Sequence, residues 1–164
     1  MFKRVENNIN LAQVENEISN YWDEIDAFQT SLNNRKHDKI FRFYDGPPFP
    51  TGSPHYGNLL AGVIKDIVPR YWTMRGYYVE RRFGWDVHGL PIEMEVQKNL
   101  NLEDPQQIDE YGIGKFNEAC RTQVQTNTEN WEKITRKIGR WVDFENDYKT
   151  MDIDFMESVW WVFK

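Results

Sequence analysis

Two side chains near the middle of the chain have the chemistry of a phosphate site. His55 and Asn58 lie on either side of Gly57, at the end of the Gly/Pro-rich loop YDGPPFPTGSPHYGN (44–58). Both can donate hydrogen bonds to phosphate oxygens, and the helical pattern that begins at Asn58 would put them at a helix N-terminus with its partial positive charge. This arrangement predicts a nucleotide-phosphate site. The alternative is a Pro-rich structural turn whose histidine only caps the helix.

A second loop, GWDVHGLP (84–91), contains a carboxylate between glycines. Asp86 stands beside a tryptophan, and a partly shielded carboxylate suits a substrate ammonium group. An N-cap or Asx-turn aspartate explains the same spacing equally well. His88 is a further candidate in this loop, with a less defined role.

The pattern around these loops predicts an α/β unit. Residues 39–44 and 77–83 have the β-branched and aromatic composition of strands, and residues 58–75 have helical spacing, with Pro69 expected to kink the helix or end it early. A strand, helix and strand in this order predict parallel strands with a right-handed crossover. Both loops would then lie at the carboxyl edge of one sheet, where ligands bind in open α/β folds.

The remaining chain reads mainly as helix. Residues 1–38 form a predicted N-terminal helical extension whose helix Asn10 would cap, and residues 39–164 form the predicted first part of a nucleotide-binding domain. A long amphipathic helix is expected up to Ile138, and residues 140–149 are expected to be a charged connection. A last helix would be capped by Asp154 with Glu157. Its apolar pattern continues to the last residue, so we expect a fragment that ends within a helix.

Composition excludes several classes of function. The 164 residues carry a net charge of −6, which gives no overall attraction for nucleic acid. Cys120 is the one cysteine, so no internal disulfide forms and a reducing, cytoplasmic compartment is expected; its place on an apolar stripe favours a core residue over a nucleophile. No apolar run is long enough to predict a membrane span.

Other chemistries lack their motifs. The Walker sequence and the dinucleotide fingerprint G-x-G-x-x-G are both absent. The histidines, Glu93 and Cys120 have no recognisable metal-ligand spacing, so no metal site is predicted from the chain. Neither Ser53 nor Ser158 lies in a nucleophile elbow, which argues against a serine hydrolase.

The two loops also resemble motifs of a known family. PFPTGSPHYGN (48–58) resembles the ATP-binding motif of class I aminoacyl-tRNA synthetases, which usually ends His-Ile-Gly-His, and GWDVHGLPIE (84–93) resembles the second loop of isoleucyl-tRNA synthetases. DGPPF and KDIVPRYWTMRGYYVERR are similar to the same enzymes, so the resemblance covers nearly the whole chain. Valine relatives have a different sequence in the second loop, and leucine relatives usually have Phe at the position of His88.

The resemblance implies a fold and a reaction. The fold would be a Rossmann-like parallel-sheet catalytic domain. The reaction would join isoleucine and ATP, accompanied by Mg²⁺, into isoleucyl-adenylate with release of pyrophosphate, and then esterify tRNA(Ile). The full-length enzyme would be a cytoplasmic monomer without a membrane segment. The family's closing Lys-Met-Ser-Lys-Ser loop, its editing domain and its tRNA-binding helices are absent from this sequence. The chain would therefore act only as part of a longer enzyme.

The resemblance also implies residue roles. His55 and Asn58 would bind the ATP phosphates during catalysis, with Pro48 and Gly57 against the nucleotide. Asp86 would pair with the ammonium group of isoleucine, and the backbone of Gly46 and Pro47 would line the amino-acid pocket. Neither loop offers a general base. None is needed, because the substrate carboxylate is already the nucleophile and catalysis rests on positioning and charge stabilisation.

Two alternatives remain open from the sequence. One is a non-catalytic nucleotide-binding or interaction module derived from a synthetase. The other is a synthetase for valine or leucine. The amino acid on which ATP–pyrophosphate exchange depends in the full-length protein separates these possibilities.

Asn58 departs from the family, which usually has His at that position, and this yields a first prediction. Asparagine still donates a hydrogen bond but cannot carry positive charge. Asn58→His should therefore keep ATP–pyrophosphate exchange of the full-length protein within about tenfold of the parent, with a changed pH dependence. A loss of roughly a hundredfold would show that Asn58 is not equivalent to the family histidine.

Overall fold

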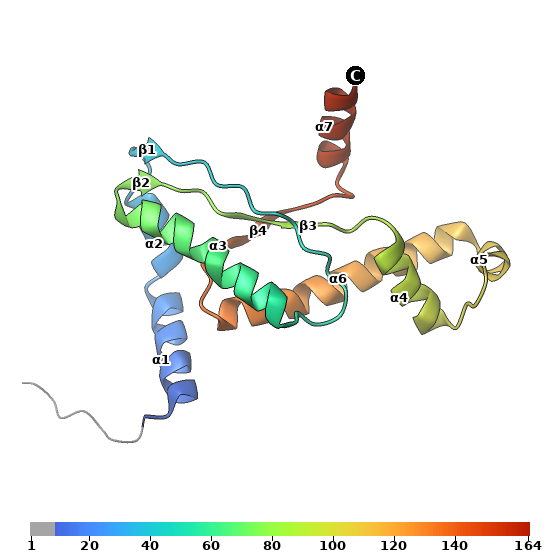
Figure 1. Ribbon diagram of the computed structural model, residues 1–164, viewed down its shortest axis with the longest axis horizontal. Coiled ribbons are helices and arrows are strands. Elements are labelled where there is room, and N and C mark those ends of the chain that lie inside the picture. The colour runs from blue at the N-terminus through green and yellow to red at the C-terminus, as the bar shows by residue number, and fades with distance from the viewer. Residues whose placement is uncertain (1–8) are drawn as a thin grey trace, which may run out of the picture.

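The structure is a computed structural model that describes residues 9–164; residues 1–8 of the predicted N-terminal extension lie outside the described part. Its elements, in chain order, are α1 (Leu11–Glu24), α2 (Ala27–Asn33), β1 (Lys39–Ile40), α3 (Tyr56–Met74), β2 (Tyr77–Tyr78), β3 (Arg82–Trp85), α4 (Leu90–Leu100), α5 (Pro105–Tyr111), α6 (Ile113–Lys137), β4 (Asp143–Lys149) and α7 (Ile153–Phe163) (Figure 1).

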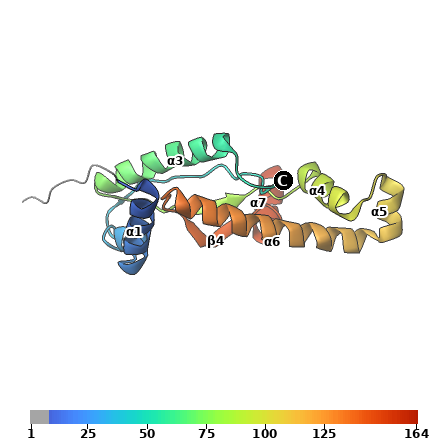
Figure 2. The ribbon, with the colours of Figure 1, turned by 90° about the horizontal axis from the view of Figure 1, so that it is seen from below.

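The predicted strand–helix–strand unit is present, with shorter strands than expected. β1 and β2 pair in parallel through Lys39 opposite Tyr77 and Ile40 opposite Tyr78, and α3 connects them. The predicted strand over 39–44 is confirmed only at Lys39–Ile40, and the predicted strand over 77–83 divides into β2 and the start of β3, with residues 79–81 between them outside both strands. The Phe41 N–H still donates to the Tyr78 carbonyl at 3.0 Å, and from residue 47 onward the prolines of the loop cannot donate to a ladder. Figure 2 shows α3 on one side of these extended segments and α6 on the other.

A second parallel pair corrects the prediction of a connection over residues 140–149, because Asp143–Lys149 form a strand. β4 pairs with β3 and lies beside it in Figure 1. Asp and Asn are depleted in strands, so the segment DFENDYK reads as a loop. Tertiary contacts outweigh that propensity: Phe144 stacks on Phe83 at 4.6 Å between ring centroids, and the Trp85 indole donates to Asp147 at 2.6 Å.

α3 continues through Pro69 to Met74, so the prediction that Pro69 could end it early was wrong. The buried Pro69 carbonyl accepts hydrogen bonds from Thr73 Oγ1 (2.8 Å) and Arg81 Nη2 (3.1 Å). These contacts stabilise the turn that follows Pro69; the missing proline N–H affects the carbonyl of Lys65, one turn earlier. Burial lowers the pKa of Arg81 to about 10, which still leaves the guanidinium charged at neutral pH. Gly76 follows the helix with φ +88°, a backbone conformation that glycine adopts readily and that ends a helix.

The main core lies between the β3–β4 pair and helices α4 and α6. Its buried members include Phe83, Trp85, Ile92, Val96, Phe116, Val124 and Trp131. Cys120 packs against this cluster, in agreement with its predicted core position. Burial, with a smaller contribution from the charge of Glu93, raises the pKa of the Cys120 thiol, which disfavours the reactive thiolate.

The N-terminal extension consists of two helices, not one. Asp26 between α1 and α2 takes φ +46°, which turns the chain, and Asn10 accepts from the Gln13 N–H (3.3 Å) as the predicted cap. Trp22 of α1 packs edge-on against Trp141 at 5.3 Å between centroids. The Arg70 guanidinium lies 4.2 Å from the Trp141 ring centroid.

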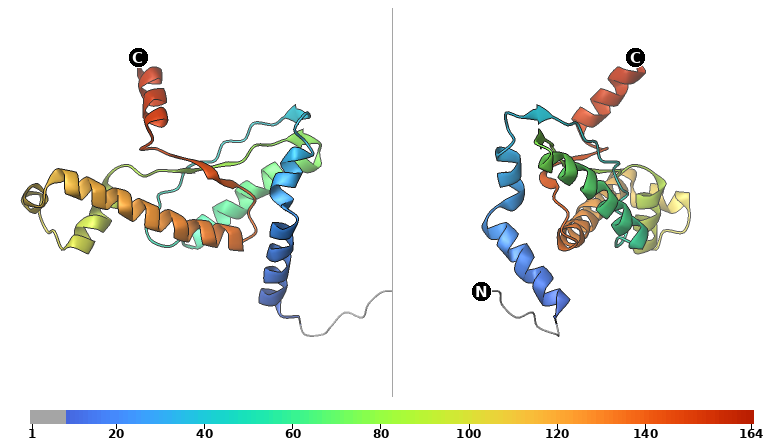
Figure 3. Two further views of the ribbon diagram at one scale, coloured as in Figure 1. Left: turned by 180° about the vertical axis from the view of Figure 1, so that it is seen from behind. Right: turned by 60° about the vertical axis from the view of Figure 1, so that its left-hand side comes forward.

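α7 extends away from the rest of the molecule (Figure 3). It begins after Asp152, so the prediction that Asp154 and Glu157 form its cap was wrong. The Asp152 carboxylate instead accepts from the Lys149 N–H at 2.7 Å, which closes the turn between β4 and α7.

The close approach of β4 to Gly84 gives a second prediction. A Cβ at Gly84 would lie 2.1 Å from Tyr148 Cζ, so Gly84→Ala should separate β3 from β4. We expect a loss of about 1–3 kcal/mol in stability, measured by thermal unfolding with tryptophan fluorescence. Gly114→Ala is the matched control, because a Cβ there meets no atom within 4 Å and should stabilise by about 0.4–1 kcal/mol. Equal stabilities for the two variants would contradict the packing argument.

Candidate functional site

His55 and Asn58 together cap the N-terminus of α3. His55 Nδ1 accepts from the Gly57 N–H at 3.0 Å, and Asn58 Oδ1 accepts from the His55 N–H at 3.0 Å. The capping alternative for His55 is therefore correct as a description of the local structure. It does not exhaust the donors of either side chain.

The capping bonds leave N–H groups available at the helix start. Because Nδ1 is an acceptor, the neutral His55 ring carries its proton on Nε2. Asn58 uses only its oxygen, so its amide nitrogen keeps two donors. Within residues 9–164 neither group donates to another protein atom. No acidic side chain lies in the first turn of this 19-residue helix. The arrangement suits an anion such as phosphate.

Gly57 is required by the cap itself. A Cβ at this position would lie 2.9 Å from His55 Cε1 and 3.1 Å from His55 Nδ1. A larger residue would displace the imidazole and move its Nε2 donor. The structure thus explains why glycine stands at position 57, independently of the predicted contact with a nucleotide.

The first loop begins with a buried carboxylate, Asp45, which is not among the site residues predicted from the sequence. Both Asp45 and Arg140 have buried side chains (1% and 7% exposed), and Arg140 Nη2 donates to Asp45 Oδ2. Lys65 Nζ of α3 lies 2.7 Å from Asp45 Oδ1 and donates to the Gly46 carbonyl at 3.0 Å. The Tyr148 hydroxyl donates to the Asp45 carbonyl at 3.3 Å. These partners come from distant parts of the sequence, and no local sequence pattern predicts their contacts.

The two predicted loops lie side by side. The Asp86 N–H donates to the Pro48 carbonyl at 2.9 Å, so the residue that carries the carboxylate is itself hydrogen-bonded to the first loop. Asp86 is half-buried, and its carboxylate makes no hydrogen bond or ion pair within residues 9–164. The residue that caps α4 is Gly89, so the N-cap alternative for Asp86 was wrong. A free carboxylate at this junction is suited to a cation.

Thr150 at the end of β4 organises the second loop. Its Oγ1 accepts from the Val87 N–H at 2.9 Å and lies 2.8 Å from His88 Nδ1. Burial, with the charges of Asp45 and Asp86, raises the pKa of Tyr148 on the same strand. β4 therefore contacts both loops, which no feature of its sequence suggested.

The other predicted residues lie along the same stretch of the first loop. Gly46 is exposed, while Pro47 and Pro48 are half-buried. A small cavity of about 60 Å³ beneath the loop is lined by Pro48, Asn58, Lys65 and Trp131, among others. Pro48 and Asn58 thus meet at one site.

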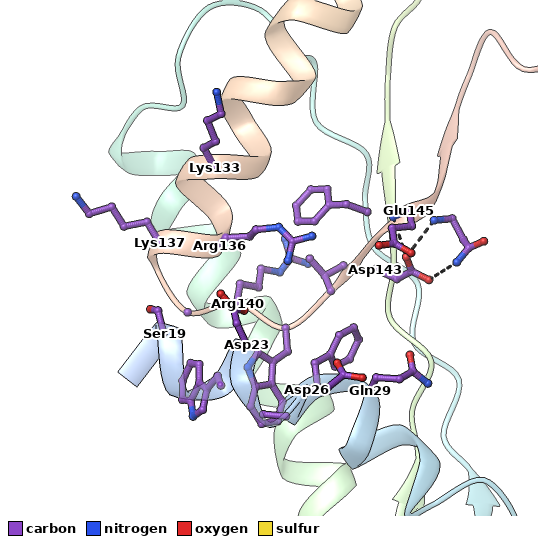
Figure 4. A pocket seen from close by; sticks show the side chains of 18 of the residues that line it. Ser19, Asp23, Asp26, Gln29, Lys133, Arg136, Lys137, Arg140, Asp143 and Glu145 are labelled. Carbon is purple, nitrogen blue, oxygen red and sulfur yellow. Dashed lines mark hydrogen bonds between the residues drawn. The ribbon is translucent and has the colours of Figure 1, made fainter. Parts of the chain in front are cut away.

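A larger cleft of about 660 Å³ lies elsewhere, between the α1–α2 arm, the end of α6 and the start of β4 (Figure 4). None of the predicted site residues lines it. Its walls mix cations and carboxylates, and Arg136 pairs with Glu132 at 2.8 Å. The mixed charges of these walls favour neither an anion nor a cation.

Metal and membrane signals are absent from the described part of the chain. Over residues 9–164 no three His, Cys, Asp or Glu side chains gather as metal ligands. In the same range no helix has the length and apolar character needed to span a membrane.

Comparison with known proteins decides the family. The family model described as tRNA synthetases class I (I, L, M and V) matches residues 17–164. The chain belongs to this family. It is 56% identical over 154 residues to the isoleucine–tRNA ligase of Chlamydia abortus, and 50% identical over 164 residues to that of Treponema denticola. It is also 55% identical over 149 residues to the "Isoleucine--tRNA ligase, cytoplasmic" of Arabidopsis thaliana.

This synthetase chain spans a small part of its relatives. The matches cover 94%, 100% and 91% of the chain but only 15%, 15% and 12% of the three relatives. Among solved structures it is similar to a LeuRS of Agrobacterium radiobacter, determined in a ternary complex with tRNA and LeuAMS. That likeness has a TM-score of 0.65 at 19% identity and covers 91% of this chain and 16% of that one. It supports the fold: a helix-rich fragment of a class I synthetase catalytic domain with short parallel strands.

The buried Asp45–Arg140 pair gives a third prediction. Asp45→Asn would leave the Arg140 charge buried without a counter-charge, which should cost about 3–5 kcal/mol in stability. Lys65→Met is the control, because Lys65 is 35% exposed and its removal keeps the Asp45–Arg140 pair; a loss of about 1 kcal/mol or less is expected. Thermal unfolding of both variants measures the difference. Equal losses would contradict the assignment of Asp45–Arg140 as the dominant pair.

Proposed function

We infer that this chain is part of an isoleucine–tRNA ligase that activates isoleucine with ATP and transfers it to tRNA(Ile). The observation that carries the proposal is the Asp86 N–H to Pro48 carbonyl bond, which joins the phosphate-suited loop to the loop with the unpaired carboxylate. Identities of 50–56% to isoleucine–tRNA ligases support isoleucine over valine or leucine.

The first step requires no protein base. The isoleucine carboxylate oxygen attacks the α-phosphorus of ATP, a new P–O bond forms, and the bond to pyrophosphate breaks with its electron pair leaving on the pyrophosphate oxygen. His55 Nε2–H and the Asn58 amide would donate to phosphate oxygens at the positive end of α3. Asp86 would bind the substrate ammonium, with Gly46 and Pro47 beside it as the wall of the amino-acid pocket.

Mg²⁺ would accompany ATP and neutralise phosphate charge. The chain offers no cage of carboxylates for it within residues 9–164, which fits a metal bound mainly through the nucleotide phosphates. Pro48 and Gly57 would lie against the nucleotide. The parallel strand pairs fit the proposal of a Rossmann-like sheet completed by further strands of a longer chain.

Completion by a longer chain is supported by apolar surface. Large apolar side chains of α3 and α7 are exposed, including Leu60 (62%), Ile67 (60%), Trp160 (70%) and Trp161 (80%). Apolar faces of this size are normally covered. We propose the division into an N-terminal extension (1–38) and the start of the catalytic domain (39–164), and a cytoplasmic, monomeric full-length enzyme.

Kinetics of the full-length protein test the site. Asp86→Asn should raise the KM for isoleucine in ATP–pyrophosphate exchange at least roughly tenfold and leave the KM for ATP within about twofold. His55→Ala should instead raise the KM for ATP at least roughly tenfold and leave the KM for isoleucine within about twofold. The controls are Asp109→Asn and His37→Ala, both exposed positions away from the loops.

Three results would contradict the proposal. Exchange that depends on valine or leucine and not on isoleucine would show that the proposed amino-acid substrate is wrong. Variants of Asp86 and His55 that behave like their controls would remove the site, and ATP binding without exchange would favour the non-catalytic module.

A further inference from the structure

One face of α6 contacts the first loop from below. Asn127 Nδ2 donates to the Pro50 carbonyl at 2.6 Å, and Trp131 Nε1 donates to the Gly52 carbonyl at 3.0 Å. Between them in sequence, Asn130 Nδ2 donates to Ser53 Oγ at 3.1 Å. Positions i, i+3 and i+4 share one face of a helix, so these three α6 donors act on a single four-residue segment of the loop.

The donors of Asn127 and Trp131 both come from buried residues, 7% and 6% exposed. Pro50 is fully buried, so removing the Asn127 donor would leave its carbonyl without a partner and away from water, which costs more than losing an exposed hydrogen bond. The bond from Trp131 to Gly52 is only part-buried, because Gly52 is exposed. Asn130 is exposed and its bond to Ser53 adds less.

The amide of Asn127 is itself held in one orientation. Its oxygen accepts from Gln123 Nε2 at 3.2 Å, and its nitrogen also donates to Glu95 Oε2 of α4 at 3.1 Å. Gln123 in turn donates to Glu95 Oε1 at 3.1 Å. The network prevents the amide from turning its oxygen toward the Pro50 carbonyl, so the donor stays aimed at the loop.

We propose that Asn127 and Trp131 are positioning residues for ATP. They bind the loop carbonyls at Pro50 and Gly52, only a few residues before His55, and so set where the His55 and Asn58 donors stand at the start of α3. The inference rests on the proposed function, because it assigns these residues to the ATP half of that site. Neither residue touches the reacting atoms.

The test uses isoleucine-dependent ATP–pyrophosphate exchange in the full-length protein. Asn127→Ala and Trp131→Phe, which keeps an aromatic ring but removes the indole donor, should each raise the KM for ATP roughly tenfold. The KM for isoleucine should stay within about twofold, because Asp86 binds the loop through its backbone and not through α6. Asn130→Ala, at an exposed position that tolerates truncation, should give a smaller rise of about threefold.

A double variant separates positioning from general destabilisation. If Asn127 acts through His55, then adding Asn127→Ala to His55→Ala should change the ATP KM by less than about twofold. Asn117→Ala is the matched control: it removes an exposed asparagine of the same helix that makes no contact with the loop. Its kinetic constants and melting temperature should equal those of the parent.

The outcomes are distinct. A parent protein without isoleucine-dependent exchange overturns the proposed function, and this inference with it. With an active parent, a normal ATP KM in Asn127→Ala and Trp131→Phe overturns the inference alone. It is also overturned if both KM values rise together in step with a lower melting temperature, or if the His55 and Asn127 effects multiply.

Discussion

The first loop has more hydrogen-bond acceptors than donors, and the rest of the structure is arranged around that imbalance. Four prolines between residues 47 and 54 provide carbonyls without N–H groups. The loop therefore cannot form a ladder with a neighbouring strand. Donors must come from side chains or from other backbone segments, and they do: the carbonyls of Pro48, Pro50 and Gly52 accept from Asp86 N–H, Asn127 and Trp131.

The same arrangement explains how two loops far apart in sequence lie side by side. Proline stiffness lowers the entropy lost when the first loop takes a single shape. Hydrogen bonds from α6 and the buried Asp45–Arg140 pair then attach the loop to the rest of the fold. The second loop is aligned by the backbone bond from Asp86 to Pro48 and by the bond from Val87 to Thr150, which supports the proposal that His55 and Asp86 serve one site.

Local signals in the sequence agreed with the structure where the interaction is local. The His55–Asn58 pair at the start of α3 and the cap of α1 by Asn10 both depend on residues within a few positions of one another. Strand boundaries were less predictable, because a strand requires a partner. β4 forms from a charged segment only because Phe144 finds Phe83 and Trp85 finds Asp147.

Sequence alone determined that a phosphate-suited helix start, a glycine-flanked carboxylate and the motifs of a class I synthetase belong to this chain, because each of these is written in a few consecutive residues. Only the tertiary structure decided which distant groups hold them. Arg140, Asn127, Trp131 and Tyr148 lie outside the quoted motifs, and the segments that contain Asp45 and Lys65 do not reveal which partners these two residues have. The roles of these side chains follow from their hydrogen bonds and ion pairs. Those contacts form when α3, α6 and β4 pack around a loop that lacks N–H donors for its own carbonyls.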